Sequence, residues 1–132
     1  GYLMAAPELV REIGKAVLPY NLNVFSQIAA EVAMENYETE LGPLVQKIIA
    51  ERDRLFDELS QIKGLSPVKS EANFIVVKSV TDPTRIFADL LKHDILIRDV
   101  SKYPMLRDYF RFSVGTPEEN DYLLKTIREL MK

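Results

Sequence analysis

The first half of the chain carries its apolar residues at helical spacing. One helix is predicted to begin at Pro7, a favoured residue of the first helical turn, and to end before Pro19. A second helix is predicted from Phe25 to Asn36. Small residues dominate the apolar side of this second helix, so we expect it to pack closely against other elements and to be largely buried.

The strongest helical pattern starts at Pro43 and continues to Gly64, a residue type common just after a helix ends. One apolar stripe runs along it, formed by Leu44, Val45, Ile48, Ile49, Leu55, Phe56, Leu59 and Ile62. The charged residues from Glu51 to Asp57 fall elsewhere on the helix. We interpret them as a solvated face with ion pairs one helical turn apart.

In the second half of the chain, the spacing of the apolar residues changes, and strand patterns alternate with helical ones. Strands are predicted at 72–79, 95–100 and 109–114, and helices from Asp82 to about His93 and from Thr116 to Met131. Single strands alternating with helices predict an α+β fold, in which a small, antiparallel-rich sheet of about three to four strands is covered by helices on one face.

Composition narrows the possible chemistry. The 132 residues include no cysteine and one histidine, which excludes disulfides, thiolate sites and multi-histidine metal sites. The net charge of -3 comes without a basic stripe, so nucleic acid is not an expected partner. No apolar run reaches the ~20 residues of a membrane span, and no membrane partner is expected. A cytoplasmic protein is the default expectation.

Two arginines occupy unusual positions. Arg98 interrupts an apolar strand, and Arg111 lies on the polar face of the strand 109–114. If these strands form an antiparallel pair with its turn centred between positions 104 and 105, the two arginines face each other. Like charges in that position are destabilising unless an anion neutralises them, and guanidinium groups bind carboxylate and phosphate well. The alternative is that Asp99 or Asp108 pairs with each arginine in a structural salt bridge.

The remaining candidates are weaker. Tyr20 and Asn21 lie in a turn and could face a pocket, although turn chemistry alone explains an asparagine there. Asn73 lies at the start of a buried strand, where its amide needs hydrogen-bond partners. His93 is interpreted as a partner of a helix C-terminus. No metal site, phosphate-binding loop or complete catalytic constellation is visible.

Several segments resemble histidinol-phosphate aminotransferases. The resemblance spans essentially the whole chain, in the segments 71–77, 95–100 and 109–120 and, further forward, 1–5, 18–23 and 51–55. Its most specific part is Arg-Phe-Ser-Val-Gly-Thr-Pro-Glu-Glu-Asn at 111–120. The implied fold is that of the C-terminal part of fold type I pyridoxal-phosphate enzymes. Residues 1–36 would then be a remnant of the large domain, 37–64 a long connecting helix and 65–132 the small α+β domain.

The resemblance also implies an activity. The family consists of homodimeric enzymes that depend on pyridoxal 5'-phosphate and exchange an amino group between L-histidinol phosphate and 2-oxoglutarate, with glutamate as the other amino acid, in histidine biosynthesis. By resemblance, Arg111 binds the carboxylate of glutamate or 2-oxoglutarate. Arg98 contacts the substrate phosphate or the distal carboxylate of glutamate, and Asn73 lies near the site.

One departure bears on catalysis. In this family the lysine that binds the cofactor lies shortly before the Gly-Tyr segment that matches Gly1, so no catalytic residue is assigned within the chain and its cofactor-binding residues stay unknown. The 132 residues are therefore expected to be a fragment, inactive alone. Two alternatives stay open: a fragment of a related enzyme, such as threonine-phosphate decarboxylase or an aromatic aminotransferase, or a non-catalytic module that binds small anions or partners.

Overall fold

The chain forms two compact units, Gly1–Leu41 and Gly42–Lys132. The computed structural model describes residues 3–18 and 22–132. The long helix belongs to the second unit, together with the sheet. The division into 1–36, 37–64 and 65–132 stays a prediction.

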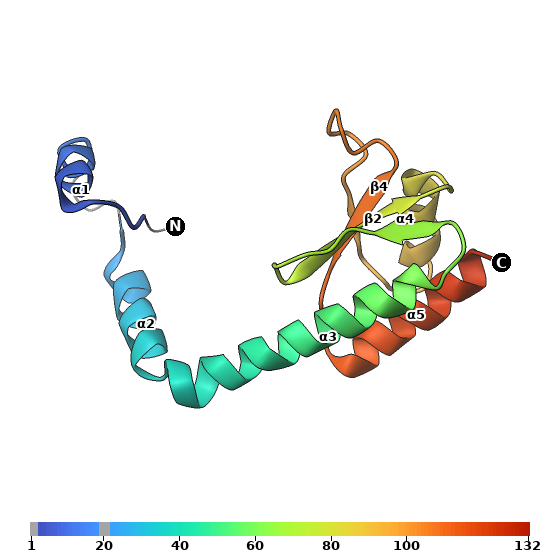
Figure 1. Ribbon diagram of the computed structural model, residues 1–132, viewed down its shortest axis with the longest axis horizontal. Coiled ribbons are helices and arrows are strands. Elements are labelled where there is room, and N and C mark those ends of the chain that lie inside the picture. Colours follow the sequence, from blue (N-terminus) through green and yellow to red (C-terminus); the bar gives the residue numbers. More distant parts are fainter. Residues whose placement is uncertain (1–2, 19–21) are drawn as a thin grey trace. The chain divides into compact units, whose positions relative to one another are not determined.

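The first unit is helical (Figure 1). It contains α1 (Pro7–Gly14), α2 (Val24–Glu35) and the π-helix η1 (Tyr37–Leu41). Pro7 opens α1 as predicted, and the Asn23 side chain caps α2 by accepting a hydrogen bond from the backbone N–H of Ser26 at 2.9 Å. None of the described residues of this unit is buried. The prediction of a largely buried α2 is therefore wrong for this chain, since no described residue of its unit covers the small and apolar side of this helix.

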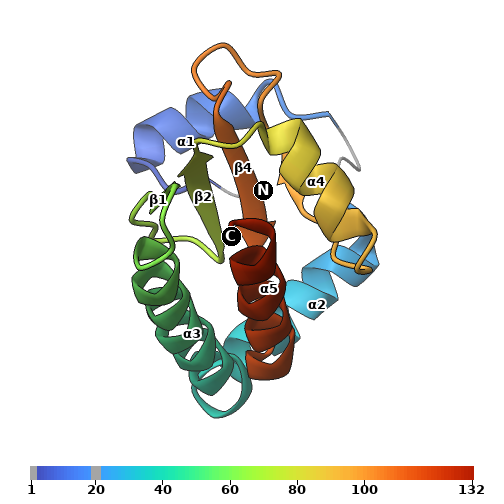
Figure 2. The same ribbon diagram turned by 90° about the vertical axis from the view of Figure 1, so that its right-hand side faces the viewer.

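The second unit is an α+β layer, which confirms the predicted fold class. Its four-stranded antiparallel sheet has the order β1-β2-β4-β3. The strands are β1 (Leu65–Pro67), β2 (Phe74–Ser79), β3 (Arg98–Asp99) and β4 (Tyr109–Ser113), and the helices are α3 (Gly42–Ser60), α4 (Pro83–Leu91) and α5 (Pro117–Leu130). Figure 2 shows α3 and α5 side by side, in agreement with their contacts.

Strand alternation separates the two faces of the sheet. On one face, Ile75 and Val77 of β2 and Phe110 of β4 are completely buried. The three helices cover this face and contribute most of the other core residues, among them Leu55, Leu59, Ile86, Leu90, Leu123, Leu124 and Ile127. The opposite face carries residues of the other parity, including Arg98 and Arg111.

Two details of the sheet differ from the sequence prediction. The strand expected at 95–100 pairs only at Arg98–Asp99, because residues 95–97 diverge from β4. The edge strand β1 was not predicted. It has only three residues and ends in Pro67, which cannot donate a ladder hydrogen bond and is tolerated at a sheet edge.

The turn after α3 depends on Gly64. The helix ends at Ser60, four residues earlier than predicted, and Gly64 adopts a positive φ of 90° in the turn that leads into β1. A Cβ atom at this position would lie 2.8 Å from Val80 Cγ2 and 3.0 Å from Met131 Cε. Both the backbone conformation and the packing therefore require glycine.

Candidate functional site

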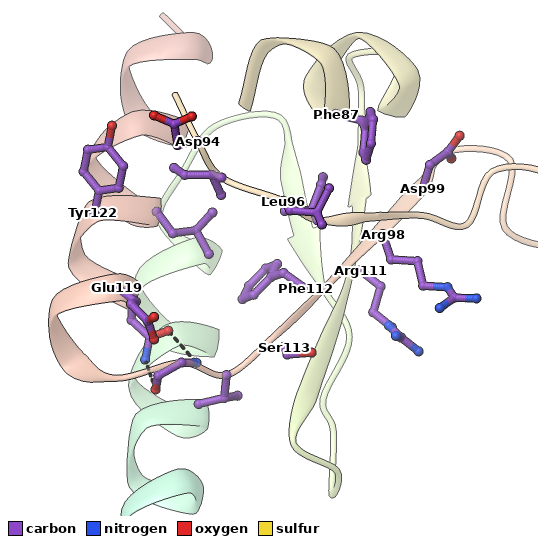
Figure 3. Close-up of a pocket in the computed structure, with 16 residues that line it drawn as sticks. Phe87, Asp94, Leu96, Arg98, Asp99, Arg111, Phe112, Ser113, Glu119 and Tyr122 are labelled. Carbon is purple, nitrogen blue, oxygen red and sulfur yellow. Dashed lines mark hydrogen bonds between the residues drawn. The ribbon is translucent and has the colours of Figure 1, made fainter. Parts of the chain in front are cut away.

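Arg98 and Arg111 lie directly opposite each other on adjacent strands. β3 pairs with β4 so that Arg98 faces Arg111 and Asp99 faces Phe110. This register confirms the predicted pairing. Figure 3 shows both arginine side chains extending to the same side of the sheet, while Phe112 points toward α5. Two guanidinium groups are thus concentrated on one sheet face.

The Arg111 guanidinium has an incomplete set of partners. Its central carbon lies 4.8 Å from the centroid of the Phe74 ring, which is within range of a cation–π contact. Its Nε is buried and makes no hydrogen bond to any residue that the structure describes. A buried donor without a partner is costly, so Arg111 has unsatisfied capacity for an acceptor.

The salt-bridge alternative is not realised. Within residues 3–18 and 22–132, neither Arg98 nor Arg111 takes part in an ion pair. The Asp99 carboxylate instead accepts the backbone N–H of Ser101 at 2.8 Å. Hydrogen bonds from the Ser101 side chain and backbone hold the pKa of Asp99 below its usual range. The nearest acid in sequence is therefore engaged in a local turn.

A pocket of about 690 Å³ adjoins the arginines (Figure 3). It lies between the diverging segments 94–99 and 111–115, with side chains of α4 and α5 completing its wall. Its lining combines the arginines and Ser113 with apolar residues such as Phe87 and Leu123. The divergence that shortens β3 therefore also opens this cavity.

The other predicted site residues are placed differently. Asn73 is exposed and does not line the pocket, but its carbonyl accepts the backbone N–H of Val114 at 2.9 Å and so extends the pairing of β2 with β4. Tyr20 and Asn21 lie outside the described residues. Their assignment to a pocket stays a prediction.

A polar cluster that reaches the pocket wall through Asn120 was not predicted from the sequence. Asn120 on α5 is 2% exposed, and its amide bonds both to Gly115 and to Glu51 on α3. Arg54 bonds to both Glu51 oxygens, at 3.1 and 2.8 Å, and to Asp121 at 2.7 Å. Arg54 and Glu51 form an ion pair one helical turn apart, as predicted, but the interpretation of residues 51–57 as a solvated face is wrong, since Arg52 is buried and Glu51 is partly buried. Asn120 lies three, four and seven residues before Leu123, Leu124 and Ile127, so it shares their buried side of α5. This spacing is the signal that could have revealed it.

Comparison with known proteins gives the chain a family. A model of the family described as aminotransferase class I and II matches residues 1–127. The chain belongs to the class I and II aminotransferases. It is 47% identical over 131 residues to histidinol-phosphate aminotransferase 1 of Carboxydothermus hydrogenoformans, and 36% identical over 132 residues to the histidinol-phosphate aminotransferase of Aquifex aeolicus. These matches cover 99% and 100% of the chain but 36% and 37% of the relatives.

Solved structures agree with this family. The histidinol-phosphate aminotransferase of Clostridium acetobutylicum matches with a TM-score of 0.75 and 25% identity, over 94% of this chain and 38% of that one. L-threonine-O-3-phosphate decarboxylase from Porphyromonas gingivalis matches with a TM-score of 0.81 over 96% of this chain and 40% of that one. With 17% identity, the second similarity concerns the fold alone.

Among the described residues of this aminotransferase chain, no helix has both the length and the apolar character needed to cross a bilayer.

Class I and II aminotransferases generally depend on pyridoxal phosphate. One similar solved structure is the histidinol-phosphate aminotransferase from Sinorhizobium meliloti in complex with pyridoxal-5'-phosphate. It matches with a TM-score of 0.57 and 28% identity, over 65% of this chain and 24% of that one. The pocket of this chain does not fit the task of anchoring that cofactor, because none of its lining residues is a lysine that could react with the cofactor aldehyde. What the pocket does offer is the guanidinium donors of Arg98 and Arg111. No step on the cofactor is therefore assigned to these residues.

Proposed function

We propose that the chain is the substrate-anion-binding part of a pyridoxal-phosphate-dependent aminotransferase that exchanges an amino group between L-histidinol phosphate and 2-oxoglutarate. The relatives named above support the substrate, since both are histidinol-phosphate aminotransferases. The chain spans about a third of their length. The activity, a homodimeric state and the cofactor therefore belong to the proposal for the whole protein.

One observation carries the role of the arginines. Arg98 and Arg111 face each other without a neutralising carboxylate in the described structure, and the buried Nε of Arg111 lacks an acceptor. A bound carboxylate or phosphate removes both unfavourable contributions. It neutralises the repulsion between the two guanidinium groups, and its oxygens accept hydrogen bonds from their unpaired N–H donors. In the proposal, Arg111 binds the carboxylate of glutamate or 2-oxoglutarate. Arg98 binds the phosphate of histidinol phosphate or the distal carboxylate of glutamate.

A related enzyme is the second candidate. The threonine-phosphate decarboxylase from Porphyromonas gingivalis shares the fold of this chain, and its substrate also carries a phosphate. Steady-state kinetics of the full-length protein with histidinol phosphate and threonine phosphate separate the two. A higher kcat/KM for transamination of histidinol phosphate supports the first candidate, whereas release of CO2 from threonine phosphate as the main reaction supports the second.

The role of Arg111 is tested by Arg111→Lys in the full-length protein. Lysine keeps the charge but loses the planar pair of donors, so we expect kcat/KM for glutamate to fall by about tenfold to about a thousandfold, or ~1.4 to 4 kcal/mol of transition-state binding. Arg85→Lys is the matched control, because Arg85 is exposed on α4 and does not line the pocket. Unchanged kinetics in Arg111→Lys together with a lower melting temperature would contradict the proposal.

A further inference from the structure

The amide of Asn120 forms a closed pair of hydrogen bonds with the backbone of Gly115. Its Oδ1 accepts the Gly115 N–H at 3.0 Å, and its Nδ2 donates to the Gly115 carbonyl at 3.0 Å. The backbone N–H and the carbonyl of Gly115 thus both bond to the Asn120 side chain, five positions further along the chain. This pairing fixes the orientation of the peptide groups on both sides of Gly115.

The same amide is anchored to α3. Nδ2 also donates to Glu51 Oε2 at 2.8 Å, and Arg54 holds both oxygens of that carboxylate. Hydrogen bonds from Arg54, and then from Asn120, lower the pKa of Glu51, so the acceptor remains charged. A buried amide with all its groups satisfied has one preferred orientation. The long helix therefore determines where the Asn120 side chain lies.

The turn after β4 packs against the same anchor. A Cβ atom added to Gly115 would lie 2.6 Å from Glu119 Oε2 and 3.4 Å from Asn120 Oδ1, so the backbone approaches α5 closely. Glu119 Oε2 accepts the Thr116 N–H at 2.8 Å as part of the capping box. The turn is thus held by side chains from α5 on one side and, through Asn120, by α3.

This turn is continuous with the anion site. Residues 112–115 line the pocket and follow Arg111 directly in the chain, and Asn120 itself contributes to the pocket wall. Ser113 and Val114 are paired with the start of β2, where Phe74 contacts the Arg111 guanidinium. Gly115 lies four residues after Arg111, so a displacement of this turn acts on the C-terminal end of the strand that has Arg111 at its centre.

We propose that Asn120 is a positioning residue for the anion site: its amide links Gly115 to Glu51 and thereby holds Arg111 in the geometry that binds a carboxylate. This inference rests on the proposed function, because it assigns Asn120 a role in the site of Arg111. Asn120 contacts no reacting atom in this scheme. It acts through the backbone of the turn.

The test uses the full-length protein and the binding of succinate, an unreactive dicarboxylate, measured by isothermal titration calorimetry. Asn120→Ala removes all three hydrogen bonds, and we expect its Kd for succinate to rise by about tenfold, because small misplacements of a clamp weaken it strongly. Asn120→Asp keeps the shape and the bond from the Gly115 N–H but loses both donated bonds. It provides the second variant if the alanine variant does not fold, and its Kd should also rise.

The matched control is Gly64→Ala, which strains the turn between α3 and β1 and lies outside the pocket lining. Its melting temperature should fall while its Kd for succinate stays within about twofold of wild type. In Asn120→Ala, KM for glutamate should rise more than kcat falls, because the variant weakens substrate binding. Equal rises of Kd in Gly64→Ala and Asn120→Ala would overturn the inference, since they would indicate general destabilisation.

The two proposals fail in different ways. If wild type does not bind succinate, or if Arg111→Lys binds it as tightly as wild type, the anion-binding function is wrong and the role of Asn120 falls with it. If wild type binds succinate in an Arg111-dependent way but folded Asn120 variants bind equally well, only the positioning role is wrong.

Discussion

An arginine held against an aromatic ring binds an anion with less loss of side-chain entropy than an arginine free in solvent. Arg111 is half-buried and lies over the Phe74 ring, whereas Arg98 across the strand is exposed. The ring restricts the plane of the guanidinium, and Nε is already removed from water. Of the two arginines, Arg111 is thus the better prepared to bind a carboxylate with two parallel hydrogen bonds.

This difference leads to a prediction for Phe74. Phe74→Leu in the full-length protein retains an apolar side chain but removes the ring face, so Arg111 loses a contact of about 1 kcal/mol. We expect the Kd for succinate to rise by about twofold to fivefold in calorimetric titrations. Phe74→Tyr keeps the ring and serves as the control. An unchanged Kd in Phe74→Leu would show that the ring does not orient Arg111.

At the scale of elements, the contact between α3 and α5 combines apolar packing with a charged cluster. Leu55 and Leu59 lie in the same core as Leu123 and Ile127. Beside them, Arg54 joins Glu51 on its own helix to Asp121 on the other. Because Asn120 also bonds to Glu51, this cluster provides the polar contacts between α3 and α5 next to the pocket.

The cluster makes stability depend on pH in the acid range. Arg54 and Asn120 hold the pKa of Glu51 below its ordinary value of 4.5 in the folded state, so the unfolded state binds the proton more readily. The stabilisation is present above the unfolded pKa and is lost as pH falls through the folded pKa. We therefore expect the free energy of unfolding, measured by urea titration of the 132-residue chain, to decrease as pH falls below 4.5.

Glu51→Gln tests the origin of this dependence. The variant should be less stable than wild type at pH 7 and should show a shallower decrease toward acid, because the titrating carboxyl is gone. Asp57→Asn removes one charge from the exposed side of the same helix and controls for net charge. An acid slope in Glu51→Gln as steep as that of wild type would place the titrating group elsewhere.

At the scale of the whole molecule, the two units differ in how they bury apolar residues. The second unit has a continuous core between the sheet and three helices. In the first unit, large apolar side chains are exposed, including Phe25 at 83% and Ile28 at 52%. Exposed apolar patches of this kind are typical of surfaces that contact other parts of a protein or a partner. The two relatives named above are nearly three times as long as this chain.

The pocket composition predicts the behaviour of the 132-residue chain with pyridoxal phosphate. Since no lysine lines the pocket, treatment with the cofactor and borohydride should give no single stoichiometric lysine adduct in a peptide map, and no transamination should be detected. Scattered, substoichiometric labelling of exposed lysines is the expected background. One fully labelled lysine accompanied by turnover would contradict the proposal that this chain binds the substrate anion but does not anchor the cofactor.

The sequence by itself determined the local elements and the main feature of the site. Apolar spacing indicated the helices, and the pattern Thr116 to Glu119 predicted the start of α5, where the structure has a capping box. An antiparallel pairing with its turn centred between positions 104 and 105 predicted that Arg98 faces Arg111, and the structure has that register. These features are readable because each depends on residues close together in the chain or on one short connection.

Only the tertiary structure decided how distant segments meet. The bond between Asn120 and Glu51 joins residues 69 positions apart, and no local pattern specifies it. The divergence of residues 95–97 from β4, which opens the pocket, and the pairing of the short edge strand β1 likewise depend on packing against α4 and β2. Periodicity reports which face of an element is apolar, but the partner of a polar group is set by the geometry of the assembled core.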